Sequence, residues 1–254
     1  MEITLVHGLL ISLAVFIIAF DYEMEGFFIF RPIIVAPIIG AILGDLNTGL
    51  LAGSLVELAF AGITQVGGVT PPDPVITSVM TVVIAKSTNA DVAAAFALAY
   101  PFGLLKQTVG TLVSTSYAFL NKKADKYAEE GNLKGIYKIA KTALCISALI
   151  SASIAFLASY GAQEPLKLLI ENMPDWLLHG FGVAGGLIPA IGFAMLLRVI
   201  LKGKFVAYLL AGFLFATFVE ITNILPIAIM GLAFALIQFY KSEDVKQGGT
   251  ESGI

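Results

Sequence analysis

The sequence is poor in the residues that carry most enzyme chemistry. Its one cysteine, Cys145, excludes a disulfide framework and any site built from paired thiols. The two histidines, His7 and His179, lie near the ends of apolar segments and far apart along the chain. The Gly-Gly pairs at 67–68 and 185–186 lack the strand that precedes a nucleotide-binding loop, and no nucleophile motif or metal-ligand spacing is present. We therefore expect no catalytic residue, metal or other cofactor in this chain.

Charge is scarce as well. Charged residues make up 13% of the 254 residues, whereas soluble domains contain about 25%. The net charge is −3 and no basic block is present, which argues against nucleic acid binding. Hydrophobic residues reach 58%, and several apolar stretches have the roughly 20 residues that a helix needs to cross a bilayer. The composition predicts an all-α, polytopic integral membrane protein rather than a soluble helical domain.

The N-terminal residues, MEITLVHG, do not have the form of a removed signal peptide. They contain no positively charged region ahead of the apolar run, and no clear small-residue cleavage site follows. We interpret this segment as a retained first transmembrane helix.

The apolar segments differ in length and in how often they are interrupted. They cover 3–20, 27–43, 49–63, 75–84, 92–120, 142–159, 181–201, 205–221 and 224–239. Residues 27–84 contain many helix-breaking glycines and prolines, and irregular backbone at membrane depth is tolerated only inside protein or along a watery cavity. Short, interrupted hydrophobic segments mark substrate sites in transporters. We expect one membrane domain over 1–240, with broken or re-entrant helices and the substrate site in 21–110, and a helical scaffold in 142–240.

The distribution of lysines along the chain predicts its orientation in the membrane. Residues 121–141, expected to form a loop, hold six of the chain's fifteen Lys and Arg residues, and a second basic turn covers 198–204. The positive-inside rule places both, together with the C-terminus, on the cytoplasmic side. Residues 161–180 then lie outside, either as an amphipathic segment along the interface with Trp176 in the aromatic belt or as an ordinary loop. The polar tail, 241–254, is predicted to be disordered.

Three polar residues stand out in the interrupted region. Glu57 lies inside an apolar run, and a charge at the bilayer centre costs about 2.5–3.5 kcal/mol. Gln65 follows eight residues later and would share a face with Glu57 on a continuous helix. Asp73, between Pro72 and Pro74, must lie at a turn. Such directional acceptors suit a sugar's hydroxyl groups, and they suit a cation too. The alternative is that Glu57 forms a structural ion pair with Lys106 or Arg31.

Two further residues lie in the middle of the long 92–120 segment. Lys106 is either a counter-ion for Glu57 or Asp73, or extends its ammonium group towards an interface. Gln107 either contacts a ligand or bonds to a neighbouring helix. Asp45 follows Gly44 and is expected to cap the next helix.

Motifs along almost the whole chain resemble one family. They are MEI at the start, FRP at 30–32, GAILGDLNTG at 40–49, GSLVEL at 53–58, PPD at 71–73, GNLKG at 131–135 and GVAGGLIPAIGFAMLL at 182–197. This pattern resembles the membrane-embedded IIC subunit of the mannose/fructose/sorbose/N-acetylgalactosamine class of the bacterial phosphoenolpyruvate-dependent sugar phosphotransferase system. The PPDP stretch and residues 183–197 are more similar to the N-acetylgalactosamine branch than to the mannose branch.

The resemblance implies a mechanism and partners. A IIC subunit works with a membrane subunit, IID, in a trimer of heterodimers in the bacterial cytoplasmic membrane. An elevator-like movement carries the sugar across, and the cytoplasmic IIB subunit, phosphorylated by IIA, then phosphorylates the sugar. The phosphoryl group never resides on IIC. The segment from Glu57 to Asp73 would form part of the sugar site. The alternatives are an ion-coupled secondary transporter and a membrane scaffold that transports nothing.

Overall fold

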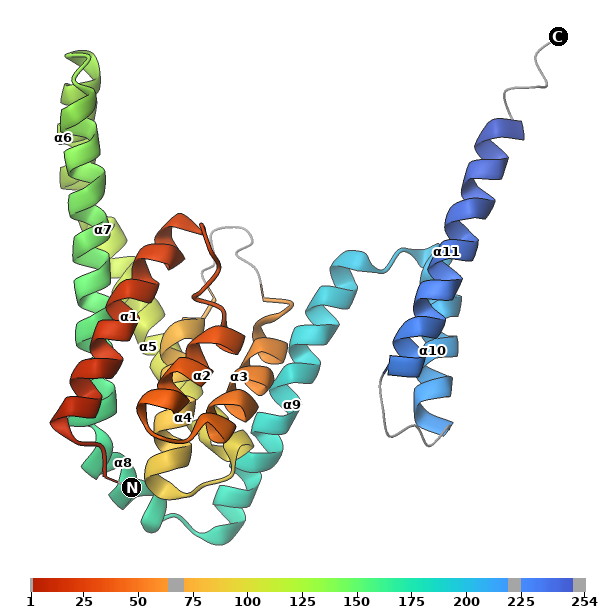
Figure 1. The fold of residues 1–254 in the computed structure, drawn as a ribbon, viewed down its shortest axis with the longest axis horizontal. Coiled ribbons are helices and arrows are strands. Elements are labelled where there is room, and N and C mark those ends of the chain that lie inside the picture. The colour runs from red at the N-terminus through yellow and green to blue at the C-terminus, as the bar shows by residue number, and fades with distance from the viewer. Residues whose placement is uncertain (1, 64–70, 219–224, 249–254) are drawn as a thin grey trace. The chain divides into compact units, whose positions relative to one another are not determined.

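The computed structural model describes residues 2–63, 71–218 and 225–248; for residue 171 and residues 241–248 it describes the backbone alone. Within these residues the secondary structure is helical, with no strand (Figure 1). The chain divides into two compact units, residues 1–197 and residues 198–254. The predicted all-helical class is confirmed.

The first unit contains the longest helices. In chain order its elements are α1 (Leu5–Met24), α2 (Pro32–Ile42), α3 (Leu46–Phe60), α4 (Pro74–Thr88), α5 (Val92–Ser116), α6 (Ala118–Glu129), α7 (Leu133–Phe156) with its π-helical continuation η1 (Leu157–Gly161), α8 (Gln163–Glu171) and α9 (Asp175–Ile200). Among the described residues, four stretches are long and apolar enough to cross a membrane, and they correspond to α1, α5, α7 with η1, and α9. The chain is therefore a multi-pass membrane protein.

Short helices follow α1, as the glycines and prolines predict. α2, α3 and α4 have 11, 15 and 15 residues. At 1.5 Å per residue the longer two reach about 22 Å, which is less than the roughly 30 Å of the hydrocarbon core. Glycines allow α2 and α3 to pack backbone against backbone, because a Cβ atom on Gly40 would lie 2.8 Å from the Cα atom of Gly49.

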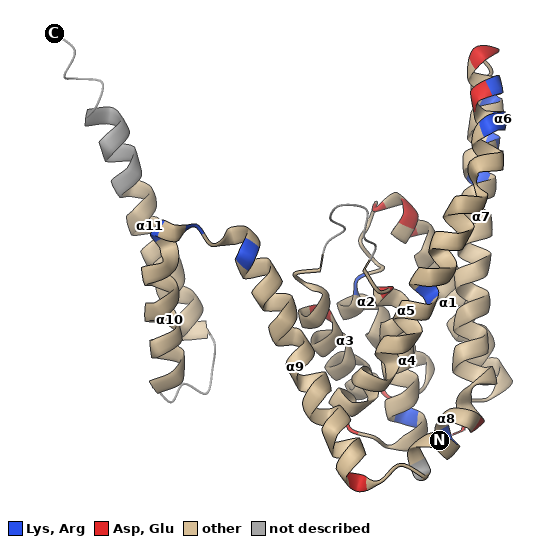
Figure 2. Ribbon diagram, turned by 180° about the vertical axis from the view of Figure 1, so that it is seen from behind, with Lys and Arg blue, Asp and Glu red and all other residues tan. Residues whose placement is uncertain are grey.

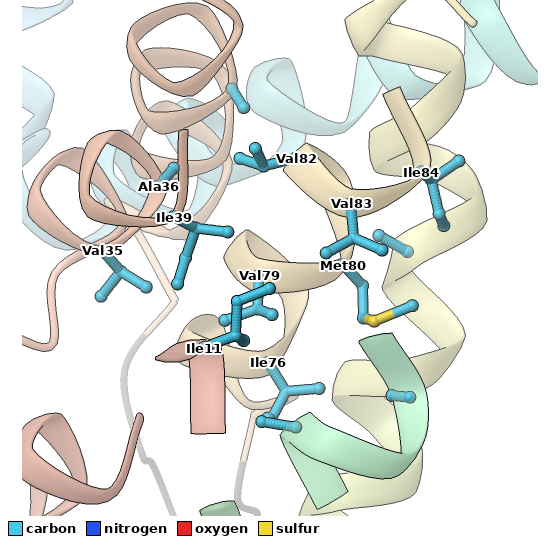
Figure 3. Packing of buried hydrophobic residues seen from close by; sticks show 14 of the residues in the cluster. Ile11, Val35, Ala36, Ile39, Ile76, Val79, Met80, Val82, Val83 and Ile84 are labelled. Atoms are coloured by element: carbon cyan, nitrogen blue, oxygen red, sulfur yellow. The ribbon is translucent and has the colours of Figure 1, made fainter. Parts of the chain in front are cut away.

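Helix α4 forms the centre of the first unit. Every residue from Val75 to Ala85 is buried. Its apolar side chains pack against Ile11 of α1 and Ile39 of α2, among others (Figure 3). The hydroxyl groups of Thr77 and Thr81 donate to carbonyl oxygens one turn earlier in the same helix, so their burial leaves no donor unpaired.

Helix α1 is fixed at its start by contacts distant in sequence. Thr4 caps the helix and exchanges hydrogen bonds with His7, which gives this histidine a structural role. The Gln163 side chain accepts from the Ile3 backbone N–H at 2.7 Å and donates to the Ile3 carbonyl at 3.1 Å. Farther along, the Ser12 hydroxyl donates to the Ala152 carbonyl at 2.9 Å, so α1 lies against α7 and α8.

The predicted loop over 121–141 is instead a helical hairpin made of α6 and the start of α7. Gly131 turns the chain at φ +63°, and Asn132 caps α7 by accepting from the Gly135 N–H at 3.0 Å. Position 135 requires glycine because a Cβ atom there would lie 2.5 Å from the ring of Tyr127. Polar, lysine-rich sequence is typical of a loop, which is why a loop was expected here. However, Lys126 and Glu130 are four residues apart, a spacing that supports a helix.

Residues 161–180 form α8, a turn and the first residues of α9. Ile170 is buried against the core, whereas Trp176 is 73% exposed. The segment is therefore helical for most of its length, and its position along an outer interface stays a prediction.

Small residues bring α9 into the first unit. A Cβ atom on Gly185 would lie 1.9 Å from the Ala93 carbonyl oxygen of α5, and one on Gly192 would lie 2.4 Å from the Ala59 carbonyl oxygen of α3. Ile188, between these glycines, packs against the cluster of Val56, Ala59, Phe60 and Phe96. Small residues allow two helix backbones to approach closely, and here they bring α9 against α3 and α5.

The second unit contains the short η2 (Gly203–Phe205), α10 (Val206–Phe218) and α11 (Leu225–Gly248). The Tyr208 hydroxyl donates to the Gln238 side-chain oxygen at 3.0 Å, which joins α10 to α11. Disorder was predicted from residue 241, but the backbone of α11 continues to Gly248. Lys, Glu and Gln in this tail are good helix formers, so the helix extends beyond the apolar run. Residues 249–254 lie outside the described part of the chain.

Candidate functional site

A polar cavity of about 470 Å³ lies between α1, the start of α4, α5 and α7. Polar and apolar side chains share its wall. Its lining residues are Tyr22, Glu23, Pro71, Asp73, Lys106, Gln107, Gly110, Thr111, Val113, Ser114, Tyr117, Ser147 and Ile150. Most of the ribbon is tan in Figure 2, and three charged residues, Glu23, Asp73 and Lys106, line this one cavity.

Asp73 is positioned by the proline-rich turn before α4. Pro74 occupies the first helical position, and the Asp73 carboxylate caps the helix by accepting from the Ile76 N–H at 2.8 Å. The Asp73 N–H donates to the Gly103 carbonyl of α5 at 3.1 Å. A Cβ atom on Gly103 would lie 2.1 Å from the Thr77 hydroxyl, so this glycine allows α5 to approach the first turn of α4.

Lys106 lies one turn beyond that glycine contact. Its ammonium nitrogen is 3.7 Å from Oδ2 of Asp73, and its side chain is 12% exposed. Of the two predicted roles, the structure shows the counter-ion, and the partner is Asp73. Gln107 lines the same cavity beside Lys106. Three of the residues singled out in the sequence, Asp73, Lys106 and Gln107, are therefore brought together.

The opposite wall consists of residues that the sequence reasoning missed. Glu23 accepts from the Ser147 hydroxyl at 2.5 Å, which joins the end of α1 to α7. Tyr117, at the end of α5, donates from its hydroxyl to the Ala143 carbonyl at 3.0 Å. The two residues of the Glu23–Ser147 pair are 124 positions apart in sequence. Only the packing of α1 on α7 makes them neighbours, and no local pattern predicts that packing.

Glu57 lies elsewhere and does not line this cavity. The Arg31 guanidinium donates to its Oε1, and the Ile33 N–H donates to its Oε2 at 3.3 Å. Glu57 thus joins α3 to the first turn of α2. This is the structural ion pair with Arg31 that was the alternative to a sugar contact. Gln65 lies outside the described residues. Helix α3 ends at Phe60, so the continuous helix that would place Glu57 and Gln65 on one face is absent.

Asp45 has the capping role that was predicted. Its carboxylate accepts from the Thr48 N–H at 3.1 Å and from the Lys86 ammonium at 2.9 Å. The pair ties the start of α3 to the end of α4. In the part of the chain that the structure describes, no group of three or more His, Cys, Asp or Glu residues is arranged to hold a metal ion.

Comparison with known proteins agrees with this architecture. The family model described as the sorbose-specific IIC component of the phosphotransferase system matches residues 5–237. The N-acetylgalactosamine permease IIC component 1 of Escherichia coli K12 is 45% identical over 97% of this chain and 92% of that protein. The mannose-specific EIIC component of the same strain is 27% identical over 93% of this chain and 89% of that protein.

Two solved structures have similar folds. One, described as the structure of a membrane protein, superposes with a TM-score of 0.83 at 25% identity and covers 94% of this chain and 97% of its own. The other, a chain of the mannose transporter ManYZ in complex with microcin E492, has a TM-score of 0.59 at 26% identity and the same coverage. Because the family model and the Escherichia coli permease both match nearly the full length, this chain belongs to the sorbose-type family of membrane IIC components of the sugar phosphotransferase system.

Proposed function

We propose that this IIC component carries an amino-hexose of the N-acetylgalactosamine type across the bacterial cytoplasmic membrane. The identity to the N-acetylgalactosamine permease is 45%, whereas identity to the mannose-specific component is 27%. Mannose, fructose and sorbose are the next candidates, because relatives named for these sugars also match.

The proposed sugar site is the cavity that contains Asp73, Lys106 and Gln107. Its volume of about 470 Å³ falls within the roughly 300–1,000 Å³ of small-molecule sites. Each sugar hydroxyl both donates and accepts, and the wall offers carboxylates, an ammonium group, an amide and hydroxyl groups. This concentration of paired polar groups inside an apolar helical protein is the observation that carries the proposal. Glu57 and Gln65 stay predicted sugar contacts; in this conformation Glu57 is bonded to Arg31 outside the cavity.

The position of the cavity supports an elevator-like movement. Tyr22 and Ser147 belong to α1 and α7, which pack on each other, whereas Asp73 and Lys106 belong to α4 and α5, which form a second pair. A sugar held between the pairs would be carried if the α4–α5 pair, with α2 and α3, moved along the α1–α7 pair. The α6–α7 hairpin and the C-terminus would then face the cytoplasm, where lysines are favoured.

The proposed partners follow from the family. The chain would pair with a IID membrane subunit, in a trimer of heterodimers, and would deliver sugar to cytoplasmic IIB, which receives its phosphoryl group from IIA. No phosphoryl group would reside on this chain.

Uptake of labelled N-acetylgalactosamine and mannose tests the proposal directly. Cells would express this chain with its IID, once with the phosphoenolpyruvate relay intact and once with IIB deleted. We expect N-acetylgalactosamine phosphate to accumulate when IIB is present and not when it is absent. Accumulation of mannose phosphate alone would reject the sugar assignment. Free sugar that accumulates without the relay and is lost with an uncoupler would instead indicate ion-coupled transport.

A further inference from the structure

An open groove of about 890 Å³ runs along one face of α7, apart from the sugar cavity. Seven residues line it: Lys134, Tyr137, Lys138, Lys141, Thr142, Cys145 and Ile146. All seven side chains are exposed on this chain. The three lysines occupy the first part of the groove and the apolar residues the last part, so the groove is amphipathic along its length.

The length of α7 locates this groove relative to a bilayer. The helical stretch Leu133–Gly161 has 29 residues and is about 44 Å long, which exceeds the roughly 30 Å hydrocarbon core by about 14 Å. Counted back from Gly161, the roughly 20 residues that fill the core begin at Thr142. Lys141 then stands at the edge of the hydrocarbon, and Lys138 and Lys134 lie about 5 and 10 Å farther out. Cys145 and Ile146 lie about 6 Å inside the core.

Within the described part of the chain, the lysines in the groove have no intramolecular charge partner. Among the described residues, the ion pairs use other cations: Arg31, Lys86, Lys106 and Lys126. Three ammonium groups on successive turns therefore face the headgroup layer with their charge uncompensated. Basic side chains at this depth attract anionic lipid headgroups.

We propose that this groove is a binding site for an anionic phospholipid. The phosphate is held by Lys138 and Lys141, Lys134 reaches the outer part of the headgroup, and one acyl chain lies along Cys145 and Ile146. Tyr137 sits at the depth that amphipathic aromatic rings prefer. An acidic protein that docks from water would meet the lysines but not Cys145 and Ile146, which lie within the hydrocarbon. The lipid is therefore the favoured occupant.

The single cysteine makes a direct test possible. A bimane fluorophore attached to Cys145 of the full-length protein, in phosphatidylcholine vesicles with increasing phosphatidylglycerol, would be quenched by brominated versions of either lipid. We expect brominated phosphatidylglycerol to quench with an apparent association at least fivefold stronger than brominated phosphatidylcholine. A fluorophore at Leu187→Cys in a Cys145→Ser background, on α9, should show no such preference.

Two matched triple variants separate a site from general attraction by charge. Lys134→Gln, Lys138→Gln and Lys141→Gln together should bring the preference to within twofold. Lys122→Gln, Lys123→Gln and Lys126→Gln, which remove the same charge from α6 of the same hairpin, should leave it intact. Equal quenching by both lipids, or equal loss in both triple variants, would overturn the proposal. Absence of quenching by either lipid would also overturn it, because the groove would then be closed to lipid.

Discussion

Asp73 and Asp45 hold similar positions in different surroundings. Each caps a helix with its carboxylate, and each lies near a lysine, Lys106 at 3.7 Å and Lys86 at 2.9 Å. Asp73 lines the polar cavity, whereas Asp45 does not. The two residues therefore form a natural pair for separating sugar recognition from helix capping.

The substitution Asp73→Asn should weaken sugar binding. Asparagine retains the cap but removes the charge beside Lys106 and one acceptor from the cavity, and hydrogen bonds to charged groups contribute about 1.5–3 kcal/mol. We expect affinity for N-acetylgalactosamine to fall about tenfold or more, measured by binding of labelled sugar to membranes. Asp45→Asn should change that affinity by less than about twofold. An equal loss in both variants would show that Asp73 acts through stability alone.

The lowered pKa of Asp45 predicts that the stability of the fold depends on pH. Hydrogen bonds from Lys86 and then from Thr48 lower the pKa of Asp45 from 3.8 to about 2, and the residue lies between α2 and α3, outside the membrane-spanning helices. Because the folded pKa is below the unfolded one, the charge stabilises the fold above about pH 4 and this contribution is lost as the pH falls towards 2. Thermal unfolding of the detergent-solubilised chain should show a smaller loss over this interval for Asp45→Asn than for the wild type. Parallel pH profiles would contradict this assignment.

At the scale of elements, helix α9 offers two glycines with opposite roles. Gly192 faces the Ala59 carbonyl of α3, where a Cβ atom would be 2.4 Å from the oxygen, whereas a Cβ atom on Gly186 would meet nothing within 4 Å. Gly192→Ala must push α9 away from α3, and such overpacking costs about 1–3 kcal/mol. Gly186→Ala should instead stabilise the helix by up to about 1 kcal/mol. Thermal unfolding of the two variants should therefore shift in opposite directions, and a shared direction would refute the α9–α3 contact.

At the scale of the whole molecule, the cavity lies between two pairs of helices. The proposed orientation in the membrane predicts from which side water reaches this cavity. Ser114 lines the cavity on α5 and is exposed. In a Cys145→Ser background, Ser114→Cys should react with an impermeant thiol reagent faster in inside-out than in right-side-out vesicles. N-acetylgalactosamine should slow this reaction and should leave Ser54→Cys, on α3, unaffected. Faster labelling from the outside would reverse the assigned orientation.

Sequence reasoning succeeded where the physical cause is local. Asp45 follows a glycine and precedes a helix, and Asp73 stands between prolines, so the roles of both in the backbone could be predicted. The wall formed by Glu23 and Ser147 could not, because it depends on α1 packing against α7 across 124 positions. Glu57 shows the intermediate case: a carboxylate inside an apolar run indicates a partner, but the choice between Arg31 and Lys106 depends on how α2 and α3 fold together.

The two hydrogen bonds between Ile3 and Gln163 have a practical consequence for protein engineering. Ile3 is 2% exposed and packs into the core, so the residues ahead of α1 are part of the folded structure. An affinity tag or fluorescent fusion joined at this end must leave Ile3 free to reach Gln163 of α8. The same cargo attached after α11 avoids that constraint, which makes the C-terminal end the better place for a purification handle.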